Sequence, residues 1–169
     1  YGIAKVYESR DTLLSLRYYE KSREFLAVPS GEEADKLRAR LWIDEAWIYI
    51  NQQSDFEKAR TNLHSAETHL QSHWHQLYID LHNAWGEFHI QQNNIEQCLE
   101  SRWLVWFKAN EINDTQRMIK MGYNLAYNLA QAQRIDEAWR MMEKVKKLAE
   151  NGGDQHVVAN CHKAFGAFC

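Results

Sequence analysis

Histidine is the residue type whose spacing first suggests chemistry in this chain. A spacing of four, as between His69 and His73, could place two imidazoles on one helix face at a separation that suits zinc. However, a turn between helices is expected near residues 71–73, and no third ligand stands beside His82 and His89. We therefore expect packed or surface histidines, no metal site and no cofactor. Six of the eight histidines fall in this one region: His64, His69, His73, His75, His82 and His89.

The cysteines give little support to nucleophilic catalysis. Cys161 and His162 are adjacent, but neighbours on a helix point about 100° apart, so they do not form a nucleophile–base pair. The chain contains no HExxH, no GxSxG and no glycine-rich phosphate loop. Its three cysteines (the others are Cys98 and Cys169) are too few for a disulfide framework and form no CxxC. We expect reduced thiols, no catalytic residues and no enzymatic activity.

The charge balance argues against broad nucleic-acid binding. Lys and Arg number 20 against 23 Asp and Glu, a formal net charge of −3. The basic run of Arg140, Lys144, Lys146 and Lys147 suits a solvated helix face rather than a nucleic-acid site. No apolar run approaches the roughly 20 residues that cross a bilayer. We expect no nucleic-acid partner, no membrane partner and a cytoplasmic location, where thiols stay reduced.

The elements that position these residues are predicted to be helices. One proline and seven glycines leave few chain breakers, and apolar residues recur at helical spacing rather than in alternation. Breaks are expected near residues 29–31, 52–55, 93–94, 113–115 and 151–154. Ser30 with Glu33, and Ser54 with Glu57, have the spacing of capping boxes and predict a helix start after each serine. The predicted fold class is all-α.

An internal repeat organises these helices. Small residues close the first helix of successive pairs at one constant interval, at Ala46, Gly86, Ala126 and Gly166. In each second helix a large apolar residue stands three positions before a small one, in the pairs Phe56–Ala59, Ile95–Cys98 and Ile135–Ala138. Two helices approach closely only where one side chain is short. Stacked hairpins of this kind bury a continuous core, which predicts a solenoid.

The repeat also sets the expected domain organisation. We expect a single array over residues 1–169, with repeats at about 1–32, 33–72, 73–112 and 113–152 and a partial repeat at 153–169. The chain begins at Tyr1 rather than at a methionine, and its last hairpin is unfinished. Both features lead us to expect a fragment of a larger protein.

These repeats resemble the tetratricopeptide repeat (TPR) family. The first helix of one copy matches the family's large, small and aromatic positions with Trp42, Ala46 and Tyr49, and its second helix matches with Phe56, Ala59, Leu63 and Ala66. Later copies carry Trp85, Gly86, Ile95, Cys98 and Val105, then Leu125, Ala126, Leu129, Ile135, Ala138 and Val145. The resemblance implies a right-handed α–α superhelix. Because the family's repeat has about 34 residues, the longer spacing here predicts longer helices, similar to the sensor arrays of large bacterial transcription regulators of the MalT-like class.

The resemblance also implies a binding groove lined by the first helices. Amides offer both a donor and an acceptor to a peptide backbone, and aromatic rings add contact area. The family's clamp for a terminal carboxylate is not matched here, because Glu87 would repel that group. The positions carried over as the partner-binding groove are Arg40, Trp47, Asn51, Asn83, Glu87, Gln91, Lys120, Tyr123, Tyr127 and Gln131.

The expected function is non-catalytic recognition of a protein or peptide by the sensor or scaffold segment of a larger regulatory protein. The alternative is a regulatory array of an enzyme system, such as a phosphatase-like helper. We also expect that apolar residues of the terminal repeat, around Ala164, Phe165 and Phe168, are exposed and offer a surface for a homodimer.

Overall fold

The described part of the chain is built from helices. A computed structural model describes residues 1–8 and 10–168; within that range there are nine α-helices, one π-helical turn and no strand. The helical share is 83%, so the predicted all-α class is confirmed. Cys169 lies outside the described residues. The chain divides into two compact units, Tyr1–Gln91 (unit 1) and Gln92–Cys169 (unit 2).

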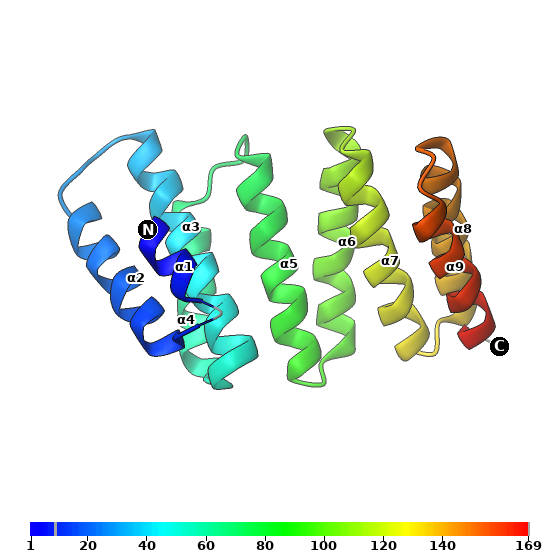
Figure 1. The fold of residues 1–169 in the computed structure, drawn as a ribbon, viewed down its shortest axis with the longest axis horizontal. Helices are drawn as coiled ribbons and strands as arrows, with labels where there is room; N and C mark the ends of the chain where they lie inside the picture. Colours follow the sequence, from blue (N-terminus) through cyan, green and yellow to red (C-terminus); the bar gives the residue numbers. More distant parts are fainter. Residues whose placement is uncertain (9, 169) are drawn as a thin grey trace. The chain divides into compact units, whose positions relative to one another are not determined.

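Unit 1 is organised around the long helix α3. The helix packs against α4 and also contacts α2 and α5 (Figure 1). Its core with α4 and α5 contains Ala39, Ile43, Ala59, Leu63 and Leu81, all essentially inaccessible to solvent. The elements of the unit are α1 (Gly2–Tyr7), α2 (Thr12–Leu26), α3 (Glu32–Ile48), the π-helical turn η1 (Tyr49–Gln53), α4 (Phe56–His69) and α5 (His75–Gln91).

The N-terminal hairpin of α1 and α2 meets the rest of unit 1 through a small apolar cluster. Ala4 and Tyr19 from the hairpin pack there with Leu41 and Ile48 of α3, and all four are buried. Because this apolar contact is small, polar pairs such as Lys5–Asp44 and Arg23–Glu45 supply a substantial share of the contact between the hairpin and α3.

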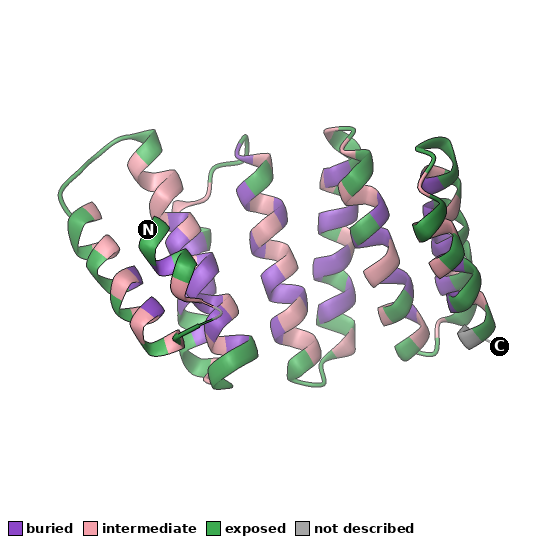
Figure 2. Ribbon diagram, in the orientation of Figure 1, coloured by how far each residue is buried: buried purple, intermediate pink, exposed green. Residues whose placement is uncertain are grey.

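Unit 2 packs its helices in chain order. α6 lies on α7, α7 on α8 and α8 on α9. The fully buried side chains of Leu125, Leu129, Met142 and Val145 form the centre of its core. In both units, Figure 2 shows buried residues on helices α3–α8, and residues of the connecting turns that are mostly exposed or intermediate. The elements of unit 2 are α6 (Ile95–Glu111), α7 (Thr115–Gln131), α8 (Ile135–Asn151) and α9 (Gln155–Phe168).

The turns of unit 2 reuse one geometry at equal intervals along the chain. Asn113, Gln133 and Gly153 adopt left-handed φ angles of 54°, 61° and 72°. After each of them the next backbone N–H donates over 2.9 Å to a carbonyl at the end of the preceding helix, in the pairs Asp114–Ala109, Arg134–Leu129 and Asp154–Ala149. This is the Schellman arrangement, which satisfies the last carbonyls of a helix. Helices of 17 residues (α6, α7 and α8) therefore alternate with three-residue turns.

Both predicted capping boxes are wrong by one residue. α3 begins after Gly31, and no side chain caps it. Ser54 lies in the left-handed region, with φ of 52°, because η1 carries the chain one turn beyond α3. Asp55 caps α4 instead, and its carboxylate accepts from the N–H of Lys58 over 3.2 Å. The breaks predicted at 93–94, 113–115 and 151–154 are confirmed.

The small residues of the predicted repeat are buried in three of four cases. Ala46, Gly86 and Ala126 are buried, as the close approach of two helices requires. Gly166 is exposed, and no described atom lies within 4 Å of the position a Cβ would take; it was expected in an unfinished hairpin, so a close approach at Gly166 stays a prediction. Among the glycines described in unit 2, Gly122 has the closest neighbours: an added Cβ would lie 2.5 Å from Trp106 Cζ3.

Candidate partner-binding faces

The predicted groove residues of α3 occupy one stripe of that helix. Arg40 and Trp47 are half-buried and two turns apart, and Asn51 is exposed one turn later in η1. The Asn51 side-chain amide donates to the Trp47 carbonyl over 3.0 Å, which fixes its orientation. Part of the Trp47 ring packs on the α3–α5 core, so the indole combines a packing role with an exposed edge.

Arg40 links this stripe to α5. Its Nη1 lies 2.7 Å from Asp80 Oδ2, and the Gln76 amide donates to both oxygens of Asp80 over 3.0 Å. Burial is the largest single influence on Arg40 and opposes its charge, but the attraction of Asp80, the hydrogen bond to it and the charge of Asp44 together raise the pKa of Arg40. A depression of about 400 Å³ lies beside this pair, and it is lined by Glu33, Lys36, Leu37, Arg40 and Leu77.

Asp44 completes the stripe, and the sequence did not single it out. It lies between Arg40 and Trp47 and is 6% exposed. The Tyr1 hydroxyl donates to Asp44 Oδ2 over 2.7 Å, and Lys5 Nζ lies 3.0 Å from Oδ1. Burial raises the pKa of Asp44, although Lys5 and Tyr1 both act to lower it. A carboxylate of α3 therefore holds helix α1 against the α3 face.

The neighbouring Glu45 likewise holds other helices against α3, in this case α2 and α4. It is 2% exposed, it is paired with the Arg23 guanidinium of α2, and it accepts from the Asn62 amide of α4 over 3.3 Å. The available signal was two adjacent acids inside an otherwise apolar run, Trp42-Ile43-Asp44-Glu45-Ala46-Trp47. Acids in such a run are almost never buried without partners.

The predicted groove residues of α5 lie on a second stripe of unit 1. Asn83 and Glu87 are half-buried and one turn apart, and Gln91 is exposed at the end of the helix. The Gln91 amide donates to Glu87 Oε1 over 3.1 Å. Together with Asp80, these residues extend the polar surface that begins at Arg40 along α5.

The remaining predicted residues lie in unit 2, all on α7. Tyr123 and Tyr127 have ring centroids 5.0 Å apart, and the Tyr123 hydroxyl donates to that of Tyr127 over 3.3 Å. Burial and this hydrogen bond raise the pKa of Tyr123 to about 12. Lys120 and Gln131 are exposed at either end of the stripe. The predicted groove residues therefore form one face in each unit.

The histidines pack among aromatic rings. His82 lies 4.3 Å from the Tyr78 ring and His89 lies 5.4 Å from Trp85, measured between centroids. α4 ends at His69, so His69 and His73 do not share a helix, as the expected turn required. Within residues 1–8 and 10–168, no group of three His, Cys, Asp or Glu side chains is arranged to hold a metal ion. None of the described helices is both long and apolar enough to cross a membrane.

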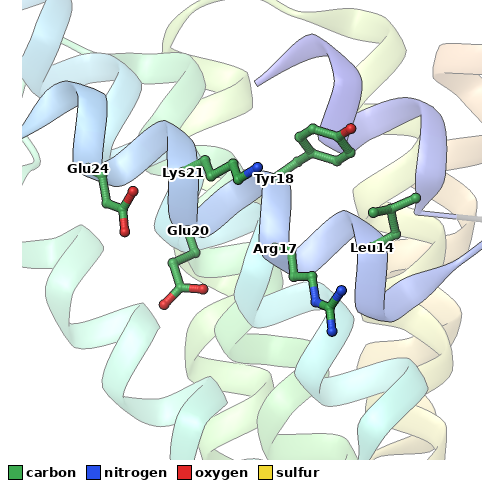
Figure 3. Close-up of a pocket in the computed structure, with 6 residues that line it drawn as sticks. All are labelled: Leu14, Arg17, Tyr18, Glu20, Lys21 and Glu24. Atoms are coloured by element: carbon green, nitrogen blue, oxygen red, sulfur yellow. The ribbon is translucent and has the colours of Figure 1, made fainter.

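Two other surfaces are less suited to binding. A depression of about 390 Å³ is lined by side chains that all project from α2 (Figure 3), so no second helix contributes to its wall. The second surface is the apolar end of α9, which was expected to be exposed. That prediction is wrong for Ala164, which is fully buried. Phe165 is half-buried against Trp139, with centroids 4.4 Å apart. The side chain of Phe168 lies outside the described residues.

No protein-family model matches this chain, and no curated protein matches it.

Proposed function

We propose that this chain is a non-catalytic module that binds a protein or peptide, and that its helix pairs form a right-handed, TPR-like superhelix within a regulatory protein. The spacing of its buried small residues supports this proposal, because Ala46, Gly86 and Ala126 are equally spaced along the chain and each is buried. Helices of equal length joined by equal turns give the same support.

The observation that carries the proposal is the pre-ordered polar face of unit 1. Lys5 is paired with Asp44, and Arg40 with Asp80, so side chains from α1, α3 and α5 are already held in place. Ordering a long side chain on binding costs about 0.5–1.5 kcal/mol, and here that cost is largely met before a partner arrives. Beside these pairs, Trp47 offers aromatic area and Asn51 offers an amide.

The way the carboxylates are used favours binding over chemistry. Asp44 and Glu45 are each tied to a cation from the N-terminal hairpin, Lys5 and Arg23 respectively. A general base must be able to accept a proton from a substrate. Carboxylates that are buried and paired in this way instead fix the helices that present the face.

The test starts from peptides selected for binding to the intact chain from a random display library. Trp47→Ala and Asn83→Ala are each expected to weaken the selected peptides at least tenfold in Kd, measured by isothermal titration calorimetry. Arg60→Ala on α4, where Arg60 is exposed beside Glu57, is the control and should leave Kd unchanged. Circular dichroism confirms that each variant is folded. Peptides whose affinity is indifferent to both Trp47→Ala and Asn83→Ala contradict the proposal.

A further inference from the structure

The outward side of α6 carries apolar residues that its own unit does not bury. Phe107 is 60% exposed and Leu104 is 41% exposed. Trp103, which is itself half-buried against the core of unit 2, stacks on Phe107 with centroids 5.5 Å apart and ring planes 24° from parallel. The opposite side of the same helix supplies Cys98, Val105 and Ala109 to the interior, all fully buried. α6 therefore has two apolar sides, and only one of them is used by the described fold.

Acidic residues stand at both ends of this apolar stretch. Glu96, Glu100, Leu104, Phe107 and Glu111 follow one another at intervals of three or four residues, so they share one stripe of α6. The side chain of Glu96 is 71% exposed and lies 4.0 Å from Arg134 Nη1, and that of Glu111 is 58% exposed and lies 2.9 Å from Lys108 Nζ. Glu100 is also exposed. An apolar centre between acids is a distinct chemical pattern that a partner has to match.

The equivalent helices show that this stripe is a special feature of α6. Cys98 of α6 aligns with Ala59 of α4 and Ala138 of α8, each fully buried. On that alignment the positions of Leu104 and Phe107 are taken by Lys144 and Lys147 in α8, both exposed, and by Ser65 and Thr68 in α4. The outward positions that Leu104 and Phe107 occupy in α6 are therefore polar in α4 and α8. Packing against the neighbouring helices does not require an apolar residue at these positions.

We propose that the outward stripe of α6, made of Glu96, Glu100, Trp103, Leu104, Phe107 and Glu111, is a docking surface for a basic amphipathic helix of a partner protein. The stripe is about 22 Å long at 1.5 Å per residue, which matches a helix of about 15 residues. Apolar side chains of the partner cover Leu104 and Phe107, and its Lys or Arg residues meet the acids at either end.

The charge pattern selects this occupant over a second copy of the chain. If two α6 stripes paired antiparallel, Glu100 of one would lie near Glu111 of the other, and like charges in such positions are unfavourable. A basic partner avoids this repulsion. Exposed contiguous apolar residues on a helix mark interaction sites in soluble proteins.

The proposal is tested with a synthetic probe, an 18-residue amphipathic helix of leucine and lysine that carries a fluorescent label, and with a matched peptide in which every lysine is glutamate. Fluorescence anisotropy with the intact chain is expected to show binding of the lysine peptide and at least tenfold weaker binding of the glutamate peptide. Phe107→Ser is expected to weaken the lysine peptide at least tenfold, and Lys147→Ser, at the equivalent position of α8, leaves its Kd unchanged.

Charge reversal separates a specific surface from general stickiness. Glu100→Lys is expected to weaken the lysine peptide and to strengthen the glutamate peptide, with both variants shown to be folded by circular dichroism. Equal affinity for the two peptides, or an unchanged Kd in Phe107→Ser, overturns the proposal. So does a stable dimer in sedimentation analysis that Phe107→Ser converts to monomer, because a second copy would then occupy the stripe.

Discussion

The indole N–H of Trp74 donates to Glu32 Oε1 over 3.0 Å, although the two residues are 42 positions apart. The same oxygen lies 2.9 Å from Lys36 Nζ and 3.2 Å from His73 Nε2. Glu32 thereby ties the first turn of α3 to the turn that precedes α5. Its hydrogen bond with Lys36, then those with Trp74 and His73, lower the pKa of Glu32 from 4.5 to about 2.

Glu32→Gln is expected to remove stability that depends on pH. Because the folded pKa lies below the unfolded one, the ionised carboxylate stabilises the fold above pH 4.5, and this contribution is lost as the pH falls toward 2. The difference in unfolding free energy between wild type and variant should therefore be largest near pH 6 and shrink toward pH 2. Urea unfolding at several pH values measures it. Glu33→Gln, which removes a carboxylate 3.0 Å from Lys36 alone, is the control, and a difference that does not change with pH contradicts the prediction.

Gly122→Ala is expected to destabilise unit 2, although alanine favours helices. Its Cβ would lie 2.5 Å from Trp106 Cζ3 and 2.7 Å from Val145 Cγ2, and overpacking of this kind costs about 1–3 kcal/mol. Denaturant unfolding followed by circular dichroism measures the loss. Gly166→Ala is the matched control, because nothing lies within 4 Å of its Cβ position, and it should stabilise by up to about 1 kcal/mol.

A double variant checks the cause of that loss. Val145→Ala alone empties a buried site and destabilises. Combined with Gly122→Ala, it removes the overlap with Val145 and leaves the one with Trp106. The double variant should therefore lose less unfolding free energy than the sum of the losses in the two single variants. Strict additivity would mean that the overlap with Val145 does not cause the destabilisation.

Gln133→Gly is expected to stabilise the turn between α7 and α8. Gln133 has φ of 61°, a left-handed conformation that costs a side chain about 1 kcal/mol and glycine almost nothing. The midpoint of denaturant unfolding should therefore rise. Gly153→Ala makes the reverse change at the equivalent position, where φ is 72°, and should lower the midpoint. The prediction fails if the two substitutions shift the midpoint in the same direction.

Lys5→Ala is expected to destabilise unit 1 most strongly at neutral pH. The substitution removes the cation that lies 3.0 Å from the buried Asp44. We expect it to lower the unfolding free energy by about 1–2 kcal/mol, which is less than for a fully buried pair because the Lys5 side chain is 40% exposed. Burial raises the pKa of Asp44 above 3.8, so the fold tolerates the neutral acid better than the anion. Unfolding free energy should fall as the pH rises through the raised pKa, and more steeply in the variant.

The variant Asp44→Asn isolates this pH dependence. It has no ionisable group at the site, so its unfolding free energy relative to wild type should rise between pH 4 and pH 7. Unfolding measured by circular dichroism at both pH values is sufficient. If the unfolding free energy of the variant relative to wild type stays constant or falls over this range, ionisation of Asp44 does not destabilise the fold and the prediction is wrong.

Sequence alone could predict the helices and the turns of the second half of the chain. Asn93, Asn113 and Gly153 are residue types that tolerate a left-handed φ, and each has one. Gln133 has the same conformation without such a signal, and its turn could be inferred only from its place midway between Asn113 and Gly153 in the sequence. At α4, Ser54 and Asp55 both resemble caps, and only the π-helical turn before them decides that Asp55 is the cap.

The candidate face was predicted only in part, for a physical reason. Helical spacing identifies residues that share a stripe, such as Arg40, Trp47 and Asn51. It does not identify partners on other helices, and the behaviour of Asp44 depends on Tyr1 and Lys5, which lie far from it in the sequence. The same limit applies to Gly122, whose closeness to Trp106 and Val145 follows from how three helices meet.

The turns of unit 2 have a consequence for how such a chain grows. Asn113 and Gly153 share one backbone conformation, and each is followed by an aspartate that caps the next helix, Asp114 or Asp154. Excising residues 114–153 would join Asn113 directly to Asp154 and recreate the same turn, and duplicating that segment would do so as well. In-frame duplication or loss of whole helix pairs therefore needs no new junction, and the length of the chain is open to change one helix pair at a time while every local boundary is kept.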